Sequence, residues 1–269
     1  MPYLSRIRIN PLRTASRHLL ANPRALHGAV QGGLPTAPEQ ERTLWRLDSD
    51  NPRRPHLYVL TQSKPDWTHL TEQAGWPDAD GEHYTIRDYT PLLSQLALGR
   101  EFAFRLTASP VQNTNRPLKP TENQKQRLEQ HLKEAENGGT HHLRGFRTGH
   151  RTAATQLEWF LTRTQRWGFD IPEAPGLTDT HDAQGRPPRD VRITTRNRHS
   201  FSKTVTTAHT HERRHTARED RVVVRTATFE GRLHITDPAL FRNHLLSGIG
   251  PSKAYGCGLL TLAPLTAGA

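Results

Sequence analysis

The sequence has one cysteine, Cys257, one methionine, and no long apolar run. A single thiol cannot form an internal disulfide or a four-thiolate zinc site, so we expect a reduced, cytoplasmic setting. No segment approaches the roughly 20 consecutive apolar residues of a membrane span. The N-terminal residues also lack the apolar core of a signal peptide. We therefore expect neither a membrane protein nor a secretory precursor.

Negative charge is also scarce. The 269 residues include 26 Asp and Glu against 37 Lys and Arg, which gives a net charge of +11. Only six of the basic residues are lysine, and the planar fork of arginine suits bidentate contacts to phosphates and base edges. A GC-rich genome would also replace lysine by arginine, but it would not create the net charge. The excess indicates a polyanionic partner, either nucleic acid or an acidic membrane surface.

The basic residues concentrate in residues 186–225, where ten arginines and Lys203 stand against four acidic residues. Within it, Val191 to Phe201 have the alternating, basic character of a strand or arm, which can follow the phosphates of double-stranded RNA. A solvated run of charge without a specific partner is the alternative. The candidate RNA contacts in this segment are Arg189, Arg192, Arg196, Arg198 and Lys203.

Residues 1–97 show one strand-helix-strand-strand-helix-strand series. Asn22-Pro23 predicts a helix N-cap followed by proline at the first helical position, and Gly32-Gly33 ends that helix. The turn-rich residues 48–52 predict a hairpin loop. The predicted elements are strands 4–9, 44–47, 56–61 and 83–89, and helices from 23 to 31 and from 66.

Residues 98–269 repeat this order without visible sequence repetition. A strand at 101–107 and a helix at 152–167 precede the basic segment, and residues 186–216 read as a loop or irregular hairpin. A hairpin at 222–236 turning at Glu230-Gly231 follows. Asp237-Pro238 then predicts the start of a helix to Leu246, and a strand at 258–262 comes last. We predict an α+β protein with two tandem ferredoxin-like domains, residues 1–97 and 98–269, and a mostly solvated helical insertion at 121–136.

A glycine-rich loop separates the last predicted helix from the last strand. GIGPSKAYGCG lacks the GK[ST] ending of a Walker loop. It also follows a helix and precedes a strand, whereas a dinucleotide-binding fingerprint follows a strand and precedes a helix. Both kinds of nucleotide-binding loop are therefore unsupported. Backbone N–H groups freed by glycine, with Lys253 as a cation, suit phosphate binding; a simple chain-reversing turn is the alternative. The candidate phosphate-binding residues here are Gly248, Gly250, Lys253, Gly256 and Gly258.

At this loop the sequence resembles a known family. GIGPSKAYGCGLLTLAP resembles the signature loop and last strand of the CRISPR repeat-processing endoribonucleases of the CasE family, which serve the type I-E Cascade complex. Further matches follow in order along nearly the whole chain. They are Asn22-Pro23 leading to Leu26-His27, Leu44-Trp45-Arg46-Leu47, Gly149-His150-Arg151 and Thr228-Phe229-Glu230-Gly231-Arg232-Leu233.

The resemblance implies two ferredoxin-like domains and a specific reaction. Members of the family cut CRISPR precursor RNA at the base of the repeat stem-loop without a metal ion or other cofactor, and leave a 2′,3′-cyclic phosphate. They stay with the mature guide RNA among the other Cascade subunits. The expected partners are therefore the repeat stem-loop, the mature crRNA and other Cascade subunits, with no membrane.

The resemblance also assigns residues. His27 matches the catalytic histidine of the first helix. His150 and Arg151 match a Lys-Arg pair in the second domain, which makes His150 a further catalytic candidate, as a charge stabiliser, and Arg151 a charge stabiliser and RNA contact. Arg24 stands where family members often have a tyrosine, and arginine can stabilise phosphorane charge but cannot act as an acid or base. A non-catalytic repeat-binding subunit of the same fold is therefore the alternative, and a general RNA-binding scaffold of the ribosomal type is a third reading.

Histidine clusters offer a weaker metal hypothesis. His209, His211 and His215 lie close in sequence, and so do His141 and His142. No cysteine or well-spaced carboxylate completes a tetrahedral set at either place. We expect no metal site, and interpret the first cluster as part of the basic RNA-contact segment.

Overall fold

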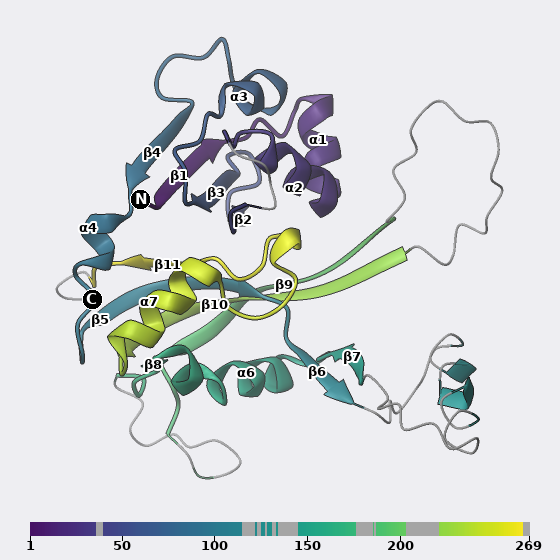
Figure 1. The fold of residues 1–269 in the computed structure, drawn as a ribbon, viewed down its shortest axis with the longest axis vertical. Helices are drawn as coiled ribbons and strands as arrows, with labels where there is room; N and C mark the ends of the chain where they lie inside the picture. The colour runs from purple at the N-terminus through teal and green to yellow at the C-terminus, as the bar shows by residue number, and fades with distance from the viewer. Residues whose placement is uncertain are drawn as a thin grey trace.

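The computed structural model describes residues 1–35, 40–114, 145–175, 187–202 and 221–265, together with residue 185 and a few positions between 122 and 133. In these parts the chain forms two antiparallel sheets and a short ladder of β6 (Val111–Thr114) and β7 (Phe146–Gly149). Figure 1 shows the first sheet above the second, with α6 on the side of the second sheet away from the first. No helix in the described parts has the length and apolar character needed to cross a membrane.

The first sheet has the strand order β2-β3-β1-β4, and each neighbouring pair is antiparallel. The strands and helices predicted in this half are confirmed. An additional helix, α1, is harder to predict because Ser16 is its only buried residue. In chain order the elements are β1 (Tyr3–Arg8), α1 (Thr14–Ala21), α2 (Pro23–Gln31), β2 (Leu44–Asp48), β3 (His56–Thr61), α3 (Thr68–Ala74) and β4 (Tyr84–Asp88).

The second sheet has the order β11-β5-β10, and both β8 and β9 pair with the remaining edge of β10. Its elements are α4 (Thr90–Leu93), β5 (Glu101–Ala108), α6 (Ala153–Leu161), η1 (Thr164–Trp167), β8 (Phe169–Asp170), β9 (Val191–Ser202), β10 (Arg221–Ile235), α7 (Pro238–Ser247), η2 (Lys253–Tyr255) and β11 (Leu260–Ala263). If the strands of each unit are numbered in chain order, with β9 as the second strand of the second unit, both sheets have the order 2-3-1-4. The first sheet reads β2-β3-β1-β4 and the second reads β9-β10-β5-β11. The fold is α+β with two tandem ferredoxin-like units; their division at residues 97 and 98 remains a prediction.

Strand β2 contributes to two separate cores. Leu44 belongs to the larger core under α6 and α7, in which Phe160 stacks on Phe104 at 5.7 Å and on Phe229 at 4.6 Å. Trp45 belongs to the smaller core with Leu26 and Val30 of α2. Because side chains alternate across a strand, Leu44 faces the second sheet while Trp45 faces the helices of the first. The first sheet is therefore covered on both faces.

Arg46 joins the two sheets. Its side chain is 2% exposed and forms an ion pair with Asp48 at 2.6 Å. The same guanidinium donates to the main-chain oxygens of Arg105, at 2.8 Å, and Leu259, at 3.1 Å, which belong to the second unit. It also lies 5.4 Å from the ring centre of Tyr58. A buried cation is tolerated because these groups replace its lost hydration.

The predicted hairpin at residues 222–236 is wrong. β10 continues from Arg221 to Ile235, and its pairing with β5 runs without interruption through Glu230 and Gly231. Gly231 serves a close approach instead of a turn, since a Cβ there would overlap the carbonyl oxygen of Asp190, just before β9. A glycine within a strand-like sequence is compatible with either a turn or a close approach of another backbone, and the sequence does not distinguish the two.

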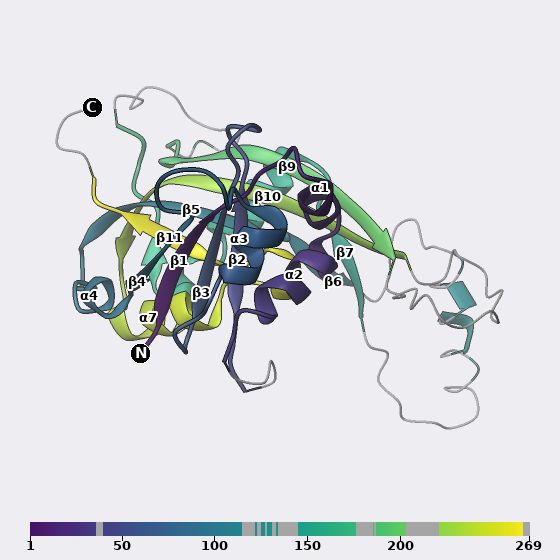
Figure 2. The same cartoon turned by 90° about the horizontal axis from the view of Figure 1, so that it is seen from above.

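Strand β9 corrects the loop interpretation of residues 186–216 in part. Residues 191–202 form a regular strand along β10, with one irregularity in register at Thr228/Phe229. Figures 1 and 2 show β9 and β10 side by side and extending beyond the rest of their sheet. β9 also contacts α2 of the first unit. The strand interpretation of Val191 to Phe201 is confirmed, and residues 203–216 of the predicted loop, including Lys203, lie outside the described residues.

Candidate functional site

His27 lies on α2, whose position is set by local capping. The side chain of Asn22 accepts hydrogen bonds from the backbone N–H groups of Arg24, at 3.0 Å, and Ala25, at 3.4 Å, and Pro23 occupies the first helical position. Leu26 anchors the helix in the smaller core, and the half-buried His27 follows it. Arg24 is exposed one turn earlier, close to the face that carries His27.

A buried tryptophan holds the His27 ring. The indole Nε1–H of Trp45 donates to His27 Nδ1 at 3.2 Å, and the Trp45 side chain is 3% exposed. Burial lowers the pKa of His27 below its ordinary value. The imidazole is therefore neutral near pH 7. Sequence reasoning expected Trp45 only as a strand residue, although a buried indole N–H normally requires an acceptor.

The glycine-rich loop has the backbone that only glycine adopts readily. Gly248, Gly250, Gly256 and Gly258 have φ angles of 82°, 74°, 78° and 93°. Hydrogen bonds from the Ile249 N–H to the Gly258 oxygen, at 2.9 Å, and from the Gly258 N–H to the Thr107 oxygen, at 2.8 Å, fasten the loop to β5. These positive φ angles explain why glycine occupies the four positions.

The same glycines permit close packing against the protein itself. A Cβ on Gly256 would lie 2.7 Å from Cζ3 of Trp45, and one on Gly248 would lie 2.6 Å from Cδ2 of Leu44. At Gly258 it would lie 2.9 Å from the carbonyl oxygen of Ile249. The loop is thus fitted to β2, the strand that holds His27. Phosphate binding by the loop backbone stays a prediction.

Lys253 and His27 line one cavity of about 380 Å³. Arg42 and Glu41, which precede β2, line it as well. Lys253 Nζ donates to the Gly250 oxygen at 2.7 Å, and its pKa is lowered, first by burial and second by Arg42. Glu41 is engaged with the backbone N–H groups of Gln62, at 3.2 Å, and Ser63, at 3.0 Å. The two cations and the neutral imidazole form a site suited to an anion.

His150 and Arg151 lie elsewhere, between β7 and α6. The His150 N–H donates to the Pro110 oxygen at 3.0 Å, and its carbonyl accepts from Gln156 Nε2 at 3.0 Å. The pKa of His150 is lowered, first by burial and second by Arg163, against a smaller opposing effect of Glu158. Neither residue lines the cavity of His27. The structure thus brings together only part of the predicted set.

The arginines around β9 are mostly engaged with the protein. Arg189 donates to the Ile171 oxygen at 2.9 Å, and Arg192 pairs with Glu230 at 3.4 Å. Arg196 donates to Gln156 Oε1 at 2.8 Å and to the carbonyl of Arg151, so it connects β9 to the start of α6. Arg198 is exposed and stands opposite Arg225. The segment is a structured surface, and Arg198 and Arg192 are its most available cations.

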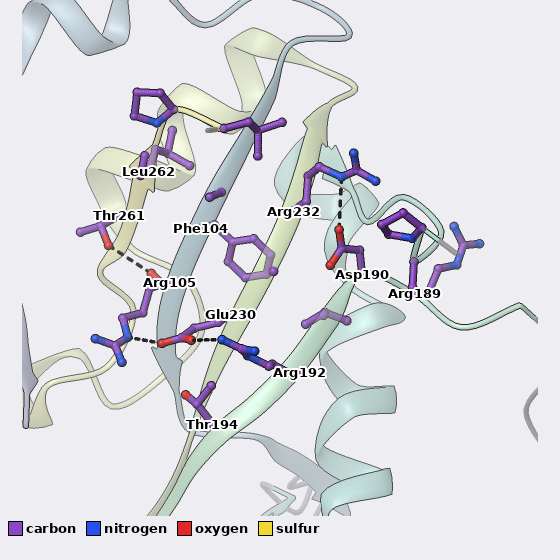
Figure 3. Close-up of a pocket in the computed structure, with 18 of the residues that line it drawn as sticks. Phe104, Arg105, Arg189, Asp190, Arg192, Thr194, Glu230, Arg232, Thr261 and Leu262 are labelled. Carbon is purple, nitrogen blue, oxygen red and sulfur yellow. Dashed lines mark hydrogen bonds and ion pairs between the residues drawn. The ribbon is translucent and has the colours of Figure 1, made fainter. Parts of the chain in front are cut away.

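A larger cavity, of about 1210 Å³, lies over the open face of the second sheet (Figure 3). Arg105 pairs there with Glu230 at 2.6 Å, and also with Asp48 at 3.1 Å and Asp50 at 2.5 Å. Arg232 pairs with Asp190 at 3.2 Å. These carboxylates neutralise the arginines of this face. The cavity beside His27 is smaller, and His27 does not line this larger one.

No three His, Cys, Asp or Glu side chains gather into a metal-binding group among the described residues. The histidine clusters considered from sequence, His141-His142 and His209 to His215, lie outside those residues. The structure therefore neither supports nor tests either cluster as a metal site.

Comparisons with known proteins give a consistent family. A family model described as CRISPR associated protein matches residues 2–264. The chain is 26% identical over 265 residues to the CRISPR-associated endoribonuclease Cse3 of Thermus thermophilus. The match covers 97% of this chain and 100% of that protein. It is also similar to the Cascade subunit CasE of Escherichia coli K12, with 50% identity over 42 residues. That match covers 16% of this chain and 21% of CasE.

Solved structures agree with this fold. A Thermus thermophilus Cse3 structure bound to an RNA that represents a pre-cleavage complex is similar to this chain, with a TM-score of 0.64 and 25% identity. The match covers 98% of this chain and 99% of that one. The likeness therefore extends over both ferredoxin-like units.

Proposed function

Because the chain belongs to the CRISPR-associated protein family, we propose that it is an endoribonuclease that binds the CRISPR repeat stem-loop and cleaves precursor crRNA. Cleavage proceeds without a metal ion, through the ribose 2′-OH, and leaves a 2′,3′-cyclic phosphate. The protein then stays with the mature crRNA among the Cascade subunits, in the cytoplasm. Cse3, which is similar over the whole chain, is named an endoribonuclease, and CasE is named a Cascade subunit.

One observation carries the proposal: His27, neutral and half-buried, shares a cavity with Lys253 and Arg42. Cleavage through the neighbouring hydroxyl requires a proton to leave the 2′-OH and another to reach the departing 5′-oxygen. It also requires cations or N–H donors where negative charge develops on the non-bridging oxygens. Lys253 and Arg42 suit that charge, and His27 suits a proton transfer or hydrogen bond at the phosphate.

The other predicted residues take supporting roles. Arg24, exposed one turn before His27, is a charge stabiliser or phosphate contact, since it cannot exchange a proton. His150 and Arg151 lie beside Arg196 of β9 and extend the RNA surface from that strand. The backbone of the loop from Gly248 to Gly258 contacts the RNA next to Lys253. We propose these residues as binding residues and leave chemistry to the His27 cavity.

The test uses the repeat RNA of the same genome. A single 2′-deoxy substitution just upstream of the scissile phosphate should abolish cleavage while binding persists, because the nucleophile alone is removed. His27→Ala should cleave roughly 10² to 10⁴ times more slowly with affinity little changed, and a chelator should have no effect. Cleavage of the deoxy substrate would overturn the mechanism.

The non-catalytic alternative makes a different prediction for the same assay. A binding subunit of this fold would hold the hairpin tightly and cut it under no condition. A general RNA-binding scaffold would bind unrelated hairpins as tightly as the repeat. Position favours the enzyme, since His27 lines a cationic cavity.

A further inference from the structure

The hydrogen bond between Trp45 and His27 restricts the protonation state of the imidazole. An indole N–H is a donor only, so the Nδ1 atom that receives it at 3.2 Å must carry a lone pair. A neutral imidazole with a lone pair on Nδ1 carries its hydrogen on Nε2. An imidazolium would place two N–H groups against each other across this contact. The bond therefore favours one neutral tautomer over both other forms.

Trp45 is fixed more firmly than the residue that it holds. Its side chain is 3% exposed in the core that Leu26 shares, and Gly256 closes over the opposite part of the ring. A Cβ on Gly256 would already lie 2.7 Å from the indole Cζ3. With no room to move on that side, the ring presents its N–H in one place. The glycine loop and the imidazole are thus connected through a single rigid side chain.

We infer that Trp45 is a positioning residue that holds His27 as the neutral Nε2–H tautomer, which makes His27 a hydrogen-bond donor at the reacting phosphate. Nδ1 is occupied, so Nε2 is the ring nitrogen that remains for substrate. In this tautomer Nε2 has no lone pair, and it cannot take the proton of the 2′-hydroxyl. The inference rests on the proposed function for its substrate, the scissile phosphate group.

The charged groups nearest His27 come from three segments. Arg24 is on the same helix, Arg42 and Glu41 lie before β2, and Lys253 comes from the glycine loop. Three of these four groups are cationic, and Glu41 is engaged with backbone N–H groups. The lowered pKa of His27 is caused by burial. Burial and the Trp45 N–H therefore both favour the neutral ring.

The direct test is nitrogen NMR of the His27 ring in the full-length protein, compared with Trp45→Phe. Phenylalanine keeps a large ring under Gly256 but has no N–H. The wild type should show one neutral tautomer protonated on Nε2. Trp45→Phe should show a mixture of tautomers and a His27 titration midpoint at higher pH, because Nδ1 then binds a proton without opposing an N–H.

Trp159→Phe is the matched control. Trp159 is also buried, also packs beside a loop glycine, Gly250, and donates its N–H to the Val111 oxygen at 3.0 Å. It therefore reproduces the loss of one indole hydrogen bond near the same loop without touching His27. Its His27 resonances and titration should match the wild type.

Cleavage of the repeat RNA gives the second readout. Trp45→Phe should lower kcat roughly tenfold with repeat affinity unchanged, a smaller loss than His27→Ala, because part of the population keeps the active tautomer. Trp159→Phe should leave both kcat and repeat affinity unchanged.

The outcomes separate the two proposals. A wild-type imidazole protonated on Nδ1, or His27 spectra that Trp45→Phe leaves unchanged, overturns the positioning role, and the wild-type spectrum decides this even if the variant fails to fold. A wild-type protein with the expected tautomer that cuts no repeat RNA contradicts the proposed function instead. An unchanged kcat in a folded Trp45→Phe protein overturns the donor role.

Discussion

Gly256 is subject to two constraints, and Gly250 to one. Both residues have positive φ angles, 78° and 74°, which cost a residue with a side chain about 1–2 kcal/mol. A Cβ on Gly250 would make ordinary contact with Trp159 at 3.4 Å. A Cβ on Gly256 would lie 2.7 Å from the buried Trp45 ring. The two glycines therefore differ in packing although their backbones are similar.

Alanine substitutions should separate these constraints. We expect Gly250→Ala to lower the free energy of unfolding by about 1–2 kcal/mol, and Gly256→Ala to lower it further and to reduce cleavage through Trp45. Lys253→Ala should affect stability least, because its hydrogen bond to the Gly250 oxygen is only half-buried. Urea unfolding and repeat cleavage measure both quantities. Equal losses for the two glycine variants would argue against the fit between Gly256 and Trp45.

At the scale of elements, β9 combines a structural side and an exposed side. Arg196 reaches the start of α6 through Gln156 and the carbonyl of Arg151. Arg192 is 78% exposed and makes one long ion pair, and Arg198 is exposed opposite Arg225. A solvent-exposed ion pair contributes little to stability. Removal of Arg196 should therefore lower stability, whereas removal of Arg192 or Arg198 should leave stability nearly unchanged.

Neutralising Arg192 and Arg198 together should weaken repeat binding and reduce the slope of its salt dependence by about one for each phosphate that the protein no longer neutralises. Stability should stay unchanged. Adding Arg196→Gln should weaken binding further and also destabilise the packing of β9 against α6. Affinity measured over a range of salt concentrations checks this, with Arg87→Gln on the exposed surface of β4 as the control. An unchanged salt slope would remove β9 from the RNA interface.

At the scale of the whole molecule, Arg46 connects β2 to the second sheet. Its guanidinium pairs with Asp48 and donates to the carbonyl oxygens of Arg105 and Leu259. The adjacent Trp45 faces the other way and holds His27. One strand thus determines both how the units join and where the imidazole lies.

Arg46→Met should lower the free energy of unfolding by about 3–5 kcal/mol, because the buried Arg46–Asp48 pair is broken and the carbonyl oxygens of Arg105 and Leu259 each lose a donor. Arg87→Met, on exposed β4, should stay within about 0.5 kcal/mol of the wild type. Urea unfolding followed by tryptophan fluorescence measures both. A loss below about 1 kcal/mol for Arg46→Met would show that water replaces the guanidinium as the hydrogen-bond donor.

The histidines predict how stability varies with pH. Among the described residues, five have a lowered pKa, each chiefly because of burial: His27, His56, His150, His199 and His244. Below about pH 6.5 the unfolded chain binds protons that the folded protein does not, so stability falls as the pH drops through this range. We expect a lower Tm at pH 5.5 than at pH 7.5. His27→Asn combined with His199→Asn should make the difference smaller, and a Tm that rises at pH 5.5 would contradict the reasoning.

The sequence alone determined the local elements. Asn22-Pro23 and Asp237-Pro238 predicted helix starts that the structure confirms, with Asp237 accepting from the Leu240 N–H at 2.9 Å. Alternation in residues 101–107 predicted β5, with buried residues at every even position. These features depend on residues within one or two turns of each other, so their physics is contained in a short stretch of chain. His27 became a catalytic candidate in a different way, through the family resemblance of the loop at 248–258 and of Asn22-Pro23 leading to Leu26-His27.

The tertiary structure determined the features that depend on contacts between segments distant in sequence. Gly231 lies inside a strand because the backbone of Asp190 passes against it, and no local pattern distinguishes that from a turn. Trp45 binds His27 because β2 lies between α2 and the glycine loop. The cavity of His27 joins α2, the segment before β2 and the loop before β11. Distances between such segments are set by packing two sheets together, since close-packed cores fix positions that composition and periodicity leave open.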